Sequence, residues 1–89
     1  MARKKSERLT LPPSVGADLG AGIGVRVDGL TTLVGNVRQR QHVADGLVYT
    51  ADVAVPERIT GDLYVEDALL ALDVTLDPHV TELEWLATL

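Results

Sequence analysis

The residues of this chain that could do chemistry are two histidines, a scatter of carboxylates and a few hydroxyls. The segment DVTLDPH (residues 73–79) brings Asp73, Asp77 and His79 close together in sequence, and all three are metal-binding types. Zinc and similar ions need three or four ligands in fixed geometry, and no second group of such residues accompanies this segment. Asp77 followed by Pro78 is explained more simply as the start of a helix. We therefore expect no metal site.

The other candidate catalytic residues also lack useful spacing. Glu66 and Asp67 are adjacent, so on a strand they point to opposite sides and cannot act as an acid–base pair. Ser6 and Ser14 lie outside any Gly-x-Ser-x-Gly motif. The glycines of GAGIG (residues 20–24) do not follow the Gly-x-Gly-x-x-Gly spacing, and VRV rather than a helix follows them. We expect a protein that is not an enzyme, with no catalytic residue and no cofactor.

Positive charge recurs at alternate positions in RQRQHV (residues 38–43). On a strand this alternation would line one face with positive charge, but surfaces that bind single-stranded RNA also present stacking aromatics, which are missing here. We expect this face to pair with acidic residues, in this subunit or in a neighbour. The apolar residues at the C-terminus suit docking on the body or on another subunit. The candidate interface residues are Arg38, Arg40, Trp85, Leu86 and Leu89.

Length and composition predict a single domain that assembles. The 89 residues are 46% hydrophobic, with no Phe, no Cys, one Trp and two Tyr. The core must therefore be aliphatic, without a disulfide or a thiolate metal site to reinforce it. Small domains without such reinforcement often gain stability by oligomerising. We expect protein partners: further copies of the chain and other structural subunits.

Charge is distributed unevenly. Residues 1–8 carry a net charge of +3 and the rest of the chain carries −8, which gives −5 in total. The simplest interpretation of the basic arm is a solvated terminus. The alternative is an arm that docks on an acidic subunit or makes a weak, salt-sensitive contact with nucleic acid. The candidate arm contacts are Arg3, Lys4, Lys5 and Arg8.

We expect no membrane as a partner, because no segment of the sequence has the pattern of a membrane-spanning helix. None approaches the roughly 18 consecutive apolar residues of a membrane helix. The start, MARKKSERL, has no apolar segment of the kind that secretory signals contain. We expect a cytoplasmic protein, or a virion component that is assembled in the host cytoplasm.

Two regions follow from the distribution of glycine and proline. Residues 9–24 hold two prolines and four glycines, which predicts an extended connector. We therefore divide the chain into a basic, Gly/Pro-rich arm and connector (residues 1–22) and a β-rich domain (residues 23–89). IGVRVD (residues 23–28) alternates as a half-buried strand does. The dipeptides Asp28-Gly29 and Asp45-Gly46 are typical of hairpin turns.

The rest of the domain is predicted to be mostly strand. Residues 46–55 alternate and are rich in β-branched types, which favours a strand that ends at Pro56. Residues 62–67 and 68–76 also fit strands, although 68–76 could begin a helix. Residues 31–44 and 77–89 fit a helix or a strand equally well. The expected fold is all-β or β-dominated α+β: one small antiparallel sheet, meander or barrel-like, with a possible short C-terminal helix.

Two segments together resemble a family of viral proteins. VDGLTTLVGNV (residues 27–37) and VPERITGDL (residues 55–63) are similar to the small neck and tail-completion proteins of tailed phages and archaeal tailed viruses. The resemblance implies a helix between the two motifs and a non-enzymatic part of a ring at the head–tail junction. The matching residues are Gly29, Leu30, Leu33, Val55, Pro56, Thr60, Gly61 and Leu63.

The expected function is therefore structural. The chain would be a small oligomeric subunit of a tailed-virus particle, placed at the neck, in the tail or on the capsid. The alternative is a nucleic-acid-associated or regulatory binding module that uses the basic arm. These two hypotheses differ in what carries binding: the folded body in the first and residues 1–8 in the second.

Overall fold

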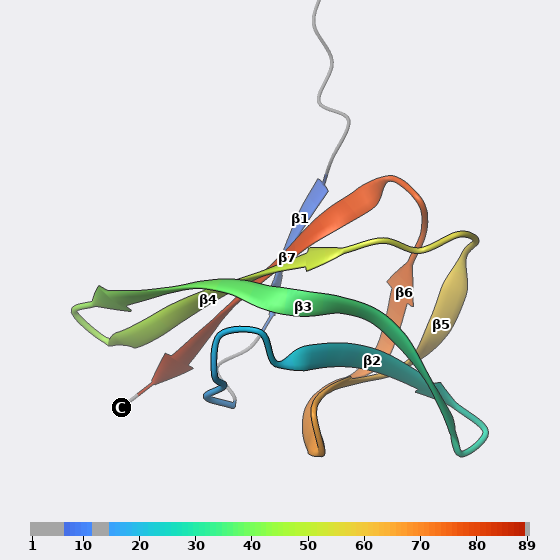
Figure 1. Cartoon of the computed structure of the whole chain (residues 1–89), viewed down its shortest axis with the longest axis horizontal. Coiled ribbons are helices and arrows are strands. Elements are labelled where there is room, and N and C mark those ends of the chain that lie inside the picture. Colours follow the sequence, from blue (N-terminus) through green and yellow to red (C-terminus); the bar gives the residue numbers. More distant parts are fainter. Residues whose placement is uncertain (1–6, 12–14, 89) are drawn as a thin grey trace, which may run out of the picture.

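The protein is one curled sheet of seven strands (Figure 1), seen in a computed structural model that describes residues 7–11 and 15–88. The order across the sheet is β1-β7-β4-β3-β2-β5-β6. Only the β1–β7 pair is parallel, and every other neighbouring pair is antiparallel. The strands are β1 (Glu7–Leu11), β2 (Gly22–Val27), β3 (Leu30–Val43), β4 (Gly46–Val53), β5 (Ile59–Val65), β6 (Ala68–Leu76) and β7 (Val80–Thr88). The predicted β-dominated, antiparallel domain is confirmed.

The first hairpin follows directly from its sequence. Ile23 and Val25 point to the buried inner face of β2, and Arg26 is exposed on the outer face. Asp28 and Gly29 both have positive φ, 50° and 82°, which is the backbone that a tight two-residue hairpin turn requires. The predicted turn is therefore confirmed. It connects β2 to β3, and the two strands then pair from Val27 opposite Leu30.

The two segments that fitted helix or strand are both strands. β3 pairs with β2 on one side and β4 on the other, so tertiary pairing decides a segment whose own pattern is ambiguous. Residues 80–88 form β7, which lies between β1 and β4. Asp77 caps a turn before β7: its Oδ1 accepts a 2.8 Å bond from the His79 amide, and its carbonyl accepts one of 2.9 Å from Val80. The described residues contain no helix.

Some predicted strand and turn boundaries differ from the structure by one to three residues. Glu66 and Asp67 form the turn between β5 and β6 and not the end of a strand. The turn between β3 and β4 falls on Ala44 and Asp45, so Gly46 already opens β4. The predicted arm and connector (residues 1–22) contain a strand: β1 pairs with β7 and adds to the sheet. Backbone pairing with a distant partner places β1 in the sheet, and local composition does not encode such pairing.

The core fills the inner face of the curl, around Trp85. This side chain has no exposed surface, and its Nε1–H donates a 2.8 Å hydrogen bond to the Val15 carbonyl. The Tyr49 ring stacks on it, with 5.2 Å between ring centroids and 12° between ring planes. The rest of the core is aliphatic, as predicted. Its largest fully buried members are Ile23, Val25, Leu63, Val65, Leu76 and Leu83.

The strands β3 and β4 approach each other closely at Gly35. A Cβ atom on Gly35 would overlap the Asp52 carbonyl oxygen and crowd the Val53 Cα, and both are backbone atoms. Gly35→Ala should therefore lower the free energy of unfolding by about 1–3 kcal/mol in urea titrations. Gly22→Ala is the matched control: there the nearest atom is the mobile tip of Leu33, 3.0 Å away, and the loss should be smaller. Equal losses in both variants would contradict this account.

Candidate interaction surfaces

Arg38 holds three strands together on the outer face. The β3–β4 register passes from Val37 opposite Ala51 to Gln39 opposite Thr50, so Arg38 is the extra residue of a β-bulge. Its Nε donates a 2.9 Å bond to Asp52 on β4, and its Nη2 donates a 2.6 Å bond to Glu82 on β7. Arg38 thus pairs with acidic residues of its own chain.

Arg40 lies on the other side of β3 from Arg38. It is directly opposite Tyr49, a core residue, and His42 is opposite Leu47. The predicted positive stripe of Arg38, Arg40 and His42 is therefore wrong, because the bulge reverses the alternation after Val37. Arg40 is exposed and forms no ion pair with a described carboxylate.

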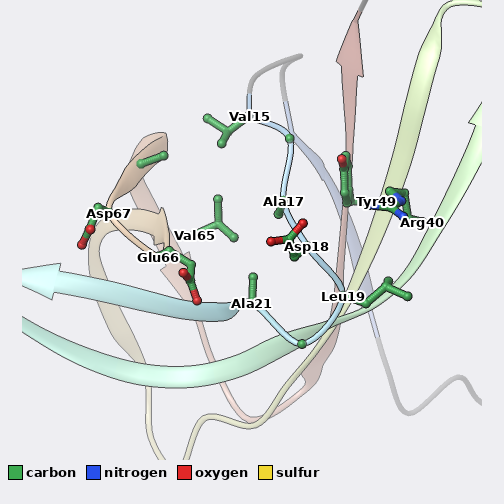
Figure 2. A pocket seen from close by; sticks show the side chains of 13 residues that line it. Val15, Ala17, Asp18, Leu19, Ala21, Arg40, Tyr49, Val65, Glu66 and Asp67 are labelled. Carbon is green, nitrogen blue, oxygen red and sulfur yellow. The ribbon is translucent and has the colours of Figure 1, made fainter.

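A groove of about 810 Å³ opens beside Arg40 (Figure 2). The segment of residues 15–21, which leads into β2, lines it. Figure 2 shows Arg40 and Tyr49 on one side of this segment and Glu66 and Asp67, from the β5–β6 turn, on the other. The groove thus has a cationic wall and an acidic wall, which suits a polar segment of protein better than an apolar ligand.

The groove is built by backbone as much as by side chains. Glu66 has a φ of 55°, and its carboxylate accepts a 3.3 Å bond from the Gly22 amide. The Glu66 amide in turn donates to the Gly22 carbonyl at 2.8 Å. These two bonds tie the β5–β6 turn to the start of β2. Within residues 7–11 and 15–88, no group of three or more His, Cys, Asp or Glu side chains could hold a metal ion.

The outer face of the sheet carries large exposed leucines, none of which was predicted to lie at an interface. Leu33, Leu69 and Leu72 are 68%, 43% and 64% exposed. Leu69 and Leu72 are three residues apart, so in a regular strand they would point to opposite faces. A register shift in the β5–β6 pair makes Leu70 an extra residue between them, and this brings both to the outside. The odd spacing of leucines within one strand was the signal that could have revealed this surface.

A second hollow, of about 520 Å³, opens at the far end of β2 and β5 from the groove. The β2–β3 turn and the segment between β4 and β5 form it, and its lining is mostly apolar. Leu30, at 77% exposure the most open of the large apolar side chains, lies at its rim. Leu30 belongs to β3, and β2 and β5 lie between β3 and β6 in the sheet.

The structure separates the remaining predicted interface residues. Trp85 has no exposed surface and belongs to the core, so its predicted place at an interface is wrong. Its indole ring stacks on Tyr49, and its N–H donates to the Val15 carbonyl. Leu86 is half-buried, opposite Val48. The predicted residues that lie outside the described side chains are Arg3, Lys4, Lys5, Arg8 and Leu89; of these, Arg8 has its backbone in β1, opposite Glu82. No helix in the described ranges is long and apolar enough to cross a bilayer.

The ion-pair cluster gives a stability test with an internal control. Arg38→Gln removes both contacts to Asp52 and Glu82, and because the side chains are partly exposed, it should lower the free energy of unfolding by only about 0.5–1 kcal/mol. The loss should shrink in about 1 M NaCl, where charges are screened within ~3 Å. Arg40→Gln makes the same chemical change on the same strand and should have almost no effect. Urea unfolding at low and at high salt gives the free energy of unfolding of the wild-type chain and of both variants.

Comparison with known proteins does not extend the family resemblance. No protein-family model, no curated protein and no solved structure matches the chain. Between the two motifs that resemble the viral neck and tail-completion proteins, residues 30–43 and 46–53 are strands, where the resemblance implies a helix. Membership of that family therefore stays a prediction from the sequence.

Proposed function

We propose that this protein is a non-enzymatic structural subunit that associates with copies of itself and with other subunits of a larger assembly. The observation that carries this proposal is the exposed apolar surface of so small a domain. Three leucines on the outer face of the sheet leave much of their side chains exposed: Leu33, Leu69 and Leu72. Single exposed leucines are ordinary, but several on one small body favour a protein–protein contact.

The construction of the core supports the same proposal. It is a single layer of aliphatic side chains inside one curled sheet, with one Trp and one Tyr as its large members. The sheet ends in two strands, β1 and β6, which each pair on one side only within the described residues. Burying outer apolar surface against another subunit would add hydrophobic stabilisation of about 25 cal/mol per Å².

The narrower proposal is that the assembly is a tailed-virus particle, at its neck, in its tail or on its capsid. It rests on the two motifs at residues 27–37 and 55–63. The genes that flank this one test it: capsid, portal or tail genes beside it are the expected result. Flanking genes with no relation to a virus would remove the narrower proposal and leave the general one standing.

Size-exclusion chromatography with light scattering tests the general proposal. The full chain should have a molar mass above that of one 9.5 kDa copy, and the mass should rise with concentration because association follows mass action. A chain that stays monomeric up to about 1 mM would contradict self-association. A chain that is a stable monomer and also converts a small-molecule substrate would overturn the proposal that this protein is a structural subunit.

A further inference from the structure

We infer that two copies of this chain bind each other through the outer face of β2, β5 and β6. This inference rests on the proposed function, because it names the surface through which the subunit would self-associate. We call this area the β6 surface and define it by Arg26, Asp62, Tyr64, Leu69 and Leu72. In the sheet β5 lies between β2 and β6, and β6 is the last strand; Figure 1 shows β5 and β6 next to each other.

The backbone of β6 is irregular in a way that exposes its leucines. The register against β5 shifts on either side of Leu63, so that β6 has an extra residue at Leu70 and another between Ala71 and Val74. Asp73 has a φ of 52°, in the left-handed region that non-glycine residues rarely adopt. Bulges sacrifice regular pairing and re-aim side chains. Here the result is that Leu69 and Leu72 both lie on the outer face.

The same irregularity argues against simple extension of the sheet. A bulged edge strand is a poor template for a further strand, because its free N–H and C=O groups do not fall in a regular row. The contact is therefore expected to use the side-chain face rather than the edge. That places the two leucines, and not the β6 backbone, at the centre of the interface.

An aromatic ring completes the apolar area next to Leu69. Tyr64 lies directly opposite Leu69 in the β5–β6 register. The Arg26 guanidinium lies over its ring, 4.0 Å from the centroid, and Nη1 donates a 3.1 Å bond to the Tyr64 hydroxyl oxygen. The Arg26 Nε also donates to the Thr31 hydroxyl oxygen at 3.1 Å. A Tyr and an Arg held rigid beside leucines are the residue types that dominate protein–protein binding energies.

The charges of the β6 surface fit a second copy of the same surface. Arg26 is opposite Asp62 in register, yet it forms no ion pair with a described carboxylate. Asp62 instead accepts a 3.3 Å bond from the Asp73 amide. Across a two-fold axis, Arg26 of each copy can meet Asp62 of the other, and the contact is made twice. The chain as a whole carries −5, so contacts through its more acidic faces are opposed by repulsion.

The first test places a charge at one of the two exposed leucines of the β6 surface. Leu72→Glu should weaken the dimer at least about tenfold in sedimentation equilibrium, since it puts a carboxylate where a leucine would be buried in each copy. Leu72 is 64% exposed in the single chain, so folding should be preserved, and thermal unfolding checks this. Leu30→Glu is the matched control: the same change at a leucine that is 77% exposed, away from the β6 surface, should leave the dimer unchanged.

The second test asks whether Arg26 and Asp62 meet across two copies. Arg26→Glu alone and Asp62→Lys alone should each dimerise weakly, because each sets like charges against each other twice. Mixing the two variants should restore association, since the mixed pair has opposite charges at both contacts. A purely intrachain role for these residues would give no recovery on mixing, whatever it did to stability.

The outcomes separate this inference from the proposed function. If the wild-type chain self-associates, and Leu72→Glu associates as tightly while mixing gives no recovery, the β6 surface is wrong and the proposed function stands on another face. If the wild-type chain is monomeric up to about 1 mM, the inference and self-association fail together. The inference is supported if Leu72→Glu weakens the dimer, Leu30→Glu leaves the dimer unchanged, and mixing Arg26→Glu with Asp62→Lys restores association.

Discussion

The fold depends on how a chain without Phe or Cys fills the inside of a curled sheet. Trp85 occupies the centre of this space and contacts three parts of the molecule. Its own strand, β7, sits between β1 and β4; its ring stacks on Tyr49 of β4; and its N–H fixes the Val15 carbonyl, 70 residues earlier in the chain. The buried aliphatic side chains of the described residues belong to one cluster with Trp85 and Tyr49, so the inner face combines two large aromatic residues with many aliphatic ones.

The outer face is specified by irregularities in two strands. The bulge at Arg38 sends a cation outward to join β3, β4 and β7, and it leaves Arg40 beside the groove. The bulges in β6 send two leucines outward together. In both places the strand gives up regular pairing to re-aim a side chain. The interior and the exterior of the sheet are thus determined by different means: alternation inside, and interruptions of alternation outside.

This division explains what could be predicted from the sequence. Alternation in IGVRVD and the Asp28-Gly29 dipeptide were enough to place a strand and its turn, and residues 46–53 followed from β-branched types. Residues 31–44 could not be decided locally, because the pairing on both sides of β3 makes the choice. The candidate surface was harder still. Trp85 was expected at an interface and is the centre of the core. Leu69 and Leu72 point outward together because of a bulge between them, and their odd spacing was the sequence signal of that bulge.

The parallel pairing of β1 with β7 has a consequence for how the molecule is made. Leu9 lies opposite Leu83, so this contact must close a loop that spans almost the whole chain. Loop-closure entropy grows with the length enclosed, whereas each of the hairpins β2–β3, β3–β4 and β5–β6 joins neighbours in sequence. During synthesis the first strand therefore has no partner until the last has emerged from the ribosome. We therefore expect the docking of β1 to be a late step that completes the sheet.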